Sequence, residues 1–393
     1  MRFIIGLFFL TSFYSYGQSD TEVYVFDLEL DQDSYQLTNQ RNVSNNPGYD
    51  NQPSFFNDNQ LLFASTRNGQ TDIASYNLRD AQTNWISDTP NGSEYSPTKI
   101  PAAMAVSAIR LDSDGLQRLY RYDFKTGTST LLLKDLVVGY HLWFNDHIIL
   151  SAVLADGGLD LVRSDLTDGS HVTLQKKIGR SLHKIPNTNL ISYVSKETDT
   201  WQIKSLDPIS GATDVITTIS KDSEDYCWLL NGTIVMGYRN ALLQFNPKKD
   251  SSWSAFKTFN DGVIWNISRV ATNSINTQFA LVSEIAPDAI VQKHIEAFNK
   301  KDRAAYFDCF SDDVKVIDYP NTLRYQGIAA LKKDYNQFFD TYDEMKVEVL
   351  TKMTSGNKVV YEEATTIDGK QRRQATIFEV ANGKITSMTF IYR

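Results

Sequence analysis

The sequence predicts a multi-domain protein of mostly β structure, in which an all-β propeller of six blades is followed by a smaller α+β domain. Three observations lead to this fold class. Aromatic residues make up 12% of the 393 residues, and aromatic side chains fit the half-buried surface of a sheet. A strand motif recurs at intervals of 39 to 50 residues over the first two thirds of the chain. After Pro287 the apolar spacing changes from the period of a strand to that of a helix.

The chain begins with a pattern typical of an export signal. Met1 and Arg2 supply positive charge, an apolar run follows from Phe3 to Leu10, and small residues flank Tyr16. We expect cleavage after Gly17, which makes 1–17 a signal peptide and places the mature chain in the periplasm or outside the cell. A buried N-terminal strand is the alternative. The apolar run is shorter than the roughly 20 residues of a spanning helix, so no membrane span is expected.

The charge balance argues against some classes of partner. The chain has 39 Lys and Arg against 47 Asp and Glu, a net charge of -8, which offers no positive surface to nucleic acid or anionic lipid. We expect no nucleic-acid partner. Residues 287–393 contain 16 basic and 16 acidic side chains. The acidic surplus therefore belongs to the preceding part of the chain, where it favours cationic or neutral partners.

The repeat is marked by a strand that ends in Asp or Asn. The markers are Phe26-Asp27, Tyr76-Asn77, Tyr122-Asp123, Ser164-Asp165, Leu206-Asp207 and Phe245-Asn246. In the first complete unit we expect four short strands, separated mainly by Asn- and Gly-rich turns, at 52–56, 61–65, 72–76 and 84–87. Four strands in a unit of about 40 residues are typical of a propeller blade.

The two ends of the repeat region complete each other. Five full units begin near residues 52, 95, 139, 181 and 225, and a sixth stops after strands at 265–268 and 279–282. Two further strands are available near the start of the chain, at 23–26 and 35–38. Their pairing with the sixth unit would close a ring over 18–282 and leave no free sheet edge. Seven blades with one divergent unit is the alternative.

The first blade resembles the TolB-type propeller repeat. The likeness rests on Pro53, Phe56-Asn57-Asp58, Leu62-Phe63-Ala64-Ser65, Arg67-Asn68-Gly69 and Asp72-Ile73. It implies an exported bacterial propeller that binds a protein or cell-envelope partner through its faces and central channel. No Gly-x-Ser-x-Gly elbow occurs, and the histidines at 141, 147, 171 and 183 have no metal-ligand spacing. We expect no metal and no cofactor.

After a linker at 283–287, a domain at 288–393 has helices first and strands afterwards, an α+β order. Apolar residues at helical spacing run from Ile290 to Phe298, a second helix is expected at 304–310, and Gly327 opens a third that ends near Phe339. Strands are expected at 314–318, 346–353, 358–366, 371–380 and 384–392. Cys227 and Cys309 fall in different domains, so no disulfide framework is expected.

The C-terminal domain is similar to the SnoaL-like and ketosteroid isomerase branch of the nuclear transport factor 2 superfold. The likeness rests on residues 297–302, Phe310-Ser311-Asp312-Asp313-Val314, Gly327 and Gly383-Lys384-Ile385. It implies a sheet curled into a cone around an apolar pocket with polar groups at its base. This superfold hosts isomerases, cyclases, dehydratases and binding modules, so the fold does not decide the function.

The resemblance also implies site residues. Asp318, before Tyr319 and Pro320, takes the position of the isomerases' general base, His294 that of a donor, and Thr376 that of an acid on a late strand. A carboxylate at an apolar pocket can take a proton next to a carbonyl if donors stabilise the product. The candidate catalytic pair is therefore Asp318 and His294. The candidate ligand-binding residues are Tyr306, Tyr319, Tyr335, Phe339, Tyr361, Thr376 and Phe390.

Two hypotheses follow. The first is an exported binding or scaffold protein, with a partner on the propeller and a small apolar molecule in the cone, or a homodimer formed through the C-terminal sheet. The second is an isomerase- or lyase-type enzyme that transfers a proton at Asp318. In the second, Asp318 and His294 must point into one cavity.

Overall fold

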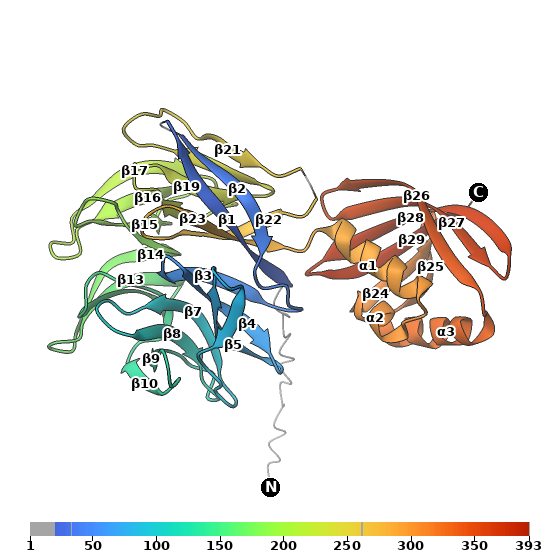
Figure 1. Cartoon of the computed structure of the whole chain (residues 1–393), viewed down its shortest axis with the longest axis horizontal. Helices are drawn as coiled ribbons and strands as arrows, with labels where there is room; N and C mark the ends of the chain where they lie inside the picture. The colour runs from blue at the N-terminus through green and yellow to red at the C-terminus, as the bar shows by residue number, and fades with distance from the viewer. Residues whose placement is uncertain (1–19, 33, 261, 393) are drawn as a thin grey trace, which may run out of the picture.

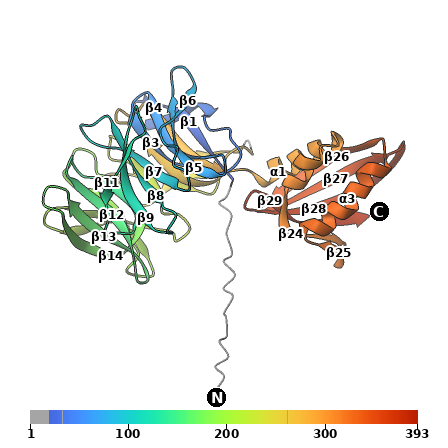
Figure 2. The same ribbon diagram turned by 90° about the horizontal axis from the view of Figure 1, so that it is seen from below.

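The computed structural model describes residues 20–32, 34–260 and 262–392. The predicted signal peptide, 1–17, lies outside these residues. Two bodies lie side by side, a larger one built of strands and a smaller one that begins at helix α1 (Figures 1 and 2). The mostly β, multi-domain fold class predicted from the sequence is confirmed.

The larger body is a propeller of six blades, five of which are continuous in sequence. Blades three and four share the long strand β14, which is the last strand of one and the first strand of the other. The two blades therefore form one seven-stranded sheet. The strands of blades one to five are β3 (Asp50–Asn57), β4 (Gln60–Arg67), β5 (Gln70–Asn77), β6 (Gln82–Trp85), β7 (Ser93–Lys99), β8 (Ala105–Leu111), β9 (Gln117–Asp123), β10 (Ser129–Leu133), β11 (Val138–Trp143), β12 (Ile148–Ala155), β13 (Gly158–Asp165), β14 (Ser170–Lys184), β15 (Ile191–Ser195), β16 (Trp201–Leu206), β17 (Thr213–Ile219), β18 (Tyr226–Trp228), β19 (Ile234–Tyr238), β20 (Ala241–Phe245) and β21 (Ser254–Thr258).

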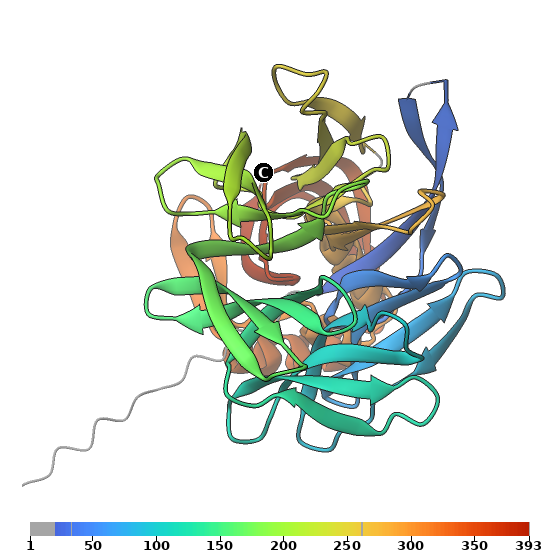
Figure 3. The same ribbon diagram turned by 90° about the vertical axis from the view of Figure 1, so that its left-hand side faces the viewer.

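The sixth blade joins the two ends of the repeat region. Its strands are β1 (Thr21–Asp31), β2 (Ser34–Asn42), β22 (Trp265–Thr272) and β23 (Gln278–Glu284), in the order β2-β1-β23-β22. β1 runs antiparallel to β23, with Val23 opposite Val282. Figure 3 shows the blades around a common centre, with the C-terminal domain behind them.

Apolar cores fill the spaces between neighbouring blades. Because successive residues of a strand face opposite sides, Leu61 and Phe63 of β4 pack with Val25 and Val282 of the sixth blade. Leu62, between them, packs with Val106 and Tyr122 of the second blade. Equivalent cores join the other neighbours. The buried residues of each blade thus hold it to both neighbours, which closes the ring.

The C-terminal body packs three helices against one six-stranded sheet. The helices are α1 (Pro287–Asn299), α2 (Arg303–Asp308) and α3 (Ile328–Thr341). The sheet order is β25-β24-β29-β28-β27-β26, with β24 and β29 parallel and the other neighbours antiparallel. The strands are β24 (Phe310–Asp318), β25 (Thr322–Gln326), β26 (Met345–Ser355), β27 (Lys358–Ile367), β28 (Lys370–Ala381) and β29 (Lys384–Tyr392).

The elements of this domain follow the predicted order, with two differences. The second helix ends at Asp308 and β24 begins at Phe310, earlier than expected. β25 was not expected, because its sequence Thr-Leu-Arg-Tyr-Gln has no strong apolar alternation and its residues are largely exposed. Gly327 precedes α3 as predicted, and its φ of 88° is a conformation that glycine adopts without a steric penalty.

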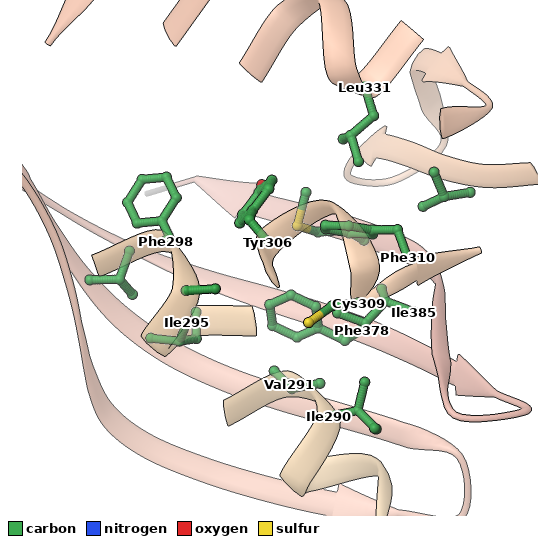
Figure 4. Packing of buried hydrophobic residues seen from close by; sticks show 14 of the residues in the cluster. Ile290, Val291, Ile295, Phe298, Tyr306, Cys309, Phe310, Leu331, Phe378 and Ile385 are labelled. Atoms are coloured by element: carbon green, nitrogen blue, oxygen red, sulfur yellow. The ribbon is translucent and has the colours of Figure 1, made fainter. Parts of the chain in front are cut away.

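One apolar core lies between the helices and the sheet. Figure 4 shows Ile295 and Phe298 of α1 in one cluster with Tyr306 of α2 and Phe378 of β28. Cys309 belongs to this core, whereas Cys227 lies in a propeller core, and both thiols are free. Within the described ranges, no helix has the length and apolar character needed to cross a membrane.

Candidate ligand-binding site

A cavity of about 680 Å³ lies in the C-terminal domain, between the helices and the concave side of the sheet. Its wall includes aromatic side chains from all three helices and from three strands. A volume of this size is in the range of small-molecule sites. The aromatic lining residues are Phe298, Tyr306, Tyr325, Tyr335, Phe338, Tyr342, Phe378, Phe390 and Tyr392.

The helical part of the wall follows from the local sequence. α1 places Ile295 and Phe298 on its buried face because residues three and four apart share a side. The Asp302 side chain accepts a hydrogen bond from the Ala305 amide and begins α2. This cap orients Tyr306, whose ring centroid lies 6.0 Å from that of Phe298 and 5.1 Å from that of Tyr335.

The tyrosine hydroxyl groups form a polar group inside the aromatic wall. The phenol groups of Tyr306, Tyr325 and Tyr335 are close enough to influence one another's pKa. Burial is the main cause that raises the pKa of each of these phenols. The hydroxyl groups therefore remain protonated at neutral pH and can donate hydrogen bonds.

Glu363 is the buried carboxyl group of the cavity wall. Its side chain extends from β27 and is 2% exposed. Oε2 accepts hydrogen bonds from Thr376 Oγ1 at 2.8 Å and from Gln374 Nε2 at 3.3 Å, whereas Oε1 has no partner among the described residues. Burial raises the pKa of Glu363. One oxygen is thus held in place and the other is available to a ligand.

His294 lies at the same cavity, on the buried face of α1. Its ring centroid is 4.8 Å from that of Tyr306, 5.0 Å from that of Phe310 and 5.6 Å from that of Phe378. Burial lowers the pKa of His294 to about 3. The imidazole is therefore neutral, and its Nδ1 has no partner among the described residues.

Two arginines lie beside aromatic rings of β29 at the cavity. The guanidinium of Arg324 lies 5.2 Å from the Phe390 ring centroid and 5.5 Å from that of Tyr392, and Arg372 also lies 5.5 Å from the Tyr392 ring. Arg324 Nε donates to Asp318 Oδ2 at 2.6 Å. Both arginines line the cavity, but Asp318 does not.

The structure brings only some of the predicted site residues together. His294, Tyr306, Tyr335 and Phe390 line the cavity, and Thr376 reaches it through Glu363. The other predicted residues, Asp318, Tyr319, Phe339 and Tyr361, do not line it.

Each of these four has a physical reason for its position. The carboxylate of Asp318 is bound by Arg324, and Tyr319 is 63% exposed. Phe339 is packed within the domain core. The Tyr361 hydroxyl donates to Asp288 Oδ1 at 2.7 Å, which directs it to the start of α1. The predicted catalytic pair of Asp318 and His294 is therefore not assembled in this cavity.

Glu363, Gln374, Arg324 and Arg372 were missed by the sequence reasoning. The alternation of β27 contains a signal for one of them, since Val359, Tyr361 and Glu363 are all buried and share a face of the strand. An acidic residue on an otherwise apolar face is uncommon unless it has partners. The sequence has no comparable signal for the two arginines, which depend on strand register.

Known proteins match the two parts of the chain separately. The sequence model of the SnoaL-like domain family matches residues 291–388. A structure assigned to TolB from Agrobacterium tumefaciens is 14% identical, has a TM-score of 0.53, and the match covers 68% of this chain and 99% of that one. TolB from Acinetobacter baumannii is 14% identical with a TM-score of 0.45, and covers 68% of this chain and 64% of its own.

A nuclear transport factor 2-like protein of unknown function from Cytophaga hutchinsonii is 19% identical with a TM-score of 0.24. That match covers 28% of this chain and 93% of the other. A search of curated proteins found no match. The chain thus combines a propeller with the fold of TolB structures and, at residues 291–388, a SnoaL-like domain.

Proposed function

We propose that this protein is an exported binding protein whose C-terminal cavity holds a small ligand with a largely apolar body and one polar end. The observation that carries the proposal is the cavity of about 680 Å³, in which an aromatic wall surrounds one unpartnered oxygen of Glu363. Apolar pockets with a few fixed polar groups are typical of small-molecule sites. The unpartnered oxygen of Glu363 would form a hydrogen bond with the polar end of the ligand.

The wider organisation of the proposal comes from the sequence. It includes export by residues 1–17, a propeller at 18–282 that binds a protein or cell-envelope partner, a linker at 283–287 and a ligand-binding domain at 288–393. The proposal also allows a homodimer formed through the C-terminal sheet. Sedimentation of the same protein would measure its mass and so reveal a dimer.

The cavity can be tested with a neutral fluorescent probe, N-phenyl-1-naphthylamine. We expect one probe per chain, with increased emission, and at least a tenfold loss of affinity in Thr365→Phe, because Thr365 lines the cavity and the added ring would fill it. Thr354→Phe is the matched control, since Thr354 lies on the exposed part of β26. Equal binding by both variants would contradict the proposal, as would no binding by the unmodified protein.

Proton-transfer catalysis is the second candidate, and Glu363 favours it. A buried carboxyl group with one unpartnered oxygen, in the same cavity wall as the neutral His294, can exchange a proton with a bound substrate. For an enzyme, Glu363→Gln should retain ligand affinity within about threefold and lose turnover about a hundredfold or more. For a binding protein, no ligand of the cavity is converted by either form.

A further inference from the structure

A second cavity, of about 410 Å³, lies at the centre of the propeller, where the first strands of blades one to three begin. Tyrosines from these three blades, Tyr49, Tyr95 and Tyr140, line it together with Gln52. Leu111 and Leu154, from hairpins of blades two and three, add apolar surface. This cavity shares no lining residue with the cavity of the C-terminal domain.

The tyrosines form one side of the cavity. The ring centroids of Tyr49 and Tyr95 are 6.1 Å apart in an edge-to-face arrangement. Burial raises the pKa of Tyr49, and the neighbouring Tyr140 and Tyr95 act in the same direction. The phenol of Tyr49 is therefore a hydrogen-bond donor at every physiological pH.

Two arginines of the opposite blades lie near these tyrosines, outside the residues that line the cavity. The guanidinium of Arg269, on β22, lies 5.8 Å from the ring centroid of Tyr140. Arg269 and Arg180 are both close enough to Tyr49 to lower its pKa, against the effect of burial. Asp225 holds the two guanidinium groups in place through Oδ2, which accepts from Arg269 NH1 at 2.6 Å and from Arg180 Nε at 2.5 Å.

The charges of this group do not balance. Among the described residues, Arg180, Arg269 and Lys196 form ion pairs with two carboxylates, Glu224 and Asp225. This group therefore has one positive charge in excess. The propeller as a whole, in contrast, carries the acidic surplus of the chain. The Ser268 hydroxyl, next to Arg269, is buried without a partner among the described residues.

We propose that this cavity binds a small aromatic carboxylate, with its ring among Tyr49, Tyr95 and Tyr140 and its carboxylate paired with Arg269 and Arg180. The single excess positive charge matches one carboxylate, and guanidinium groups bind this anion in a fixed geometry. The apolar and aromatic wall distinguishes the ligand from an inorganic anion. Phenol donors at the cavity add hydrogen bonds to the carboxylate oxygens.

Titration calorimetry of the full chain with 3-phenylpropionate tests this site, with 3-phenylpropionamide as the uncharged counterpart. We expect the acid to bind at least about tenfold more tightly than the amide, which corresponds to about 1.4 kcal/mol. Arg269→Gln should weaken binding of the acid by at least about tenfold, because a charge-assisted hydrogen bond is lost. Arg79→Gln, at an exposed turn between β5 and β6, should leave it unchanged.

The double variant Tyr49→Phe, Tyr140→Phe keeps both arginines. It tests the site even if Arg269→Gln does not fold. It should weaken binding several-fold. Equal affinity for acid and amide, or no binding of the acid at about 10 mM, would overturn the proposal. So would loss of binding in Arg324→Gln but not in Arg269→Gln, because the acid would then occupy the C-terminal cavity. The probe experiment with Thr365→Phe tests the C-terminal cavity separately, so its outcome does not depend on the outcome for the propeller cavity.

Discussion

Glu94 of the propeller and Glu363 of the C-terminal domain are both buried carboxyl groups, and burial raises the pKa of each. Their surroundings differ. Both oxygens of Glu94 accept hydrogen bonds, from Tyr122 at 2.9 Å and from Ser87 at 3.0 Å. Glu363 has partners on one oxygen only, and it lines a cavity. A raised pKa therefore does not by itself indicate a site, whereas an unpartnered oxygen at a cavity does.

Two buried histidines differ in their surroundings, although Nδ1 of each has no partner among the described residues. Burial lowers the pKa of His141 and of His294 to about 3. His141 Nε2 is hydrogen-bonded to Ser107 Oγ at 2.7 Å, and Trp143 Nε1 donates to the same hydroxyl. This arrangement joins blades two and three. His294, in contrast, lies between aromatic rings at the edge of a cavity.

The largest effect is expected from pH at Asp50, a fully buried propeller carboxyl. Burial raises its pKa from 3.8 to about 7. Because the folded state holds this proton more tightly, its stabilising contribution is complete below pH about 4 and is lost as pH rises to about 7, a change on the order of 4 kcal/mol. In urea unfolding from pH 4 to 8, Asp50→Asn should remove this slope. Asp58→Asn, at the half-buried turn between β3 and β4, should retain it, and equal slopes would contradict the assignment.

Substitution of the two glutamates by alanine compares the regions directly. Glu94→Ala should lower the free energy of unfolding by about 3 kcal/mol, because it leaves the buried Tyr122 hydroxyl without its carboxylate acceptor and leaves Ser87 with Asp72 alone. Glu363→Ala should cost about 1 kcal/mol, since water in the cavity can bind the Thr376 hydroxyl. Urea unfolding measures both, and hydrogen exchange assigns each loss to its domain. A larger loss for Glu363→Ala would reverse the comparison.

Ion pairs provide the smallest expected difference. Asp225→Asn should cost about 2 kcal/mol, because Arg180 and Arg269 both lose a charged partner in a partly buried position. Asp340→Asn breaks the exposed pair with Arg303 and should cost less than about 0.5 kcal/mol. Thermal unfolding of the two variants checks the order. Similar losses would show that the propeller pair is solvated.

The repeat made the propeller predictable, while the site depended on contacts between distant residues. Strand alternation and turn residues identify a blade wherever it recurs, and the unfinished sixth blade indicates its partner strands. The family resemblance predicts that Asp318 is a catalytic base, but Arg324 binds it through the pairing of β24 with β25, a strand that was not predicted. Glu363 meets Thr376 and Gln374 only through the register of β27 with β28. Such contacts between strands are not visible in the spacing of one sequence.

Closure of the ring has a consequence for synthesis of the chain. β1 is made first, but its partner β23 is the last strand of the propeller, and 251 residues separate Asp27 from Gln278, whose side chains are hydrogen-bonded. Until β23 has been made, the nascent propeller therefore exposes an unpaired strand edge, which is prone to association with other chains. A product that ends before residue 278 retains five blades and can never complete the sixth. Premature termination is thus expected to yield aggregates, even though most of the blades are present.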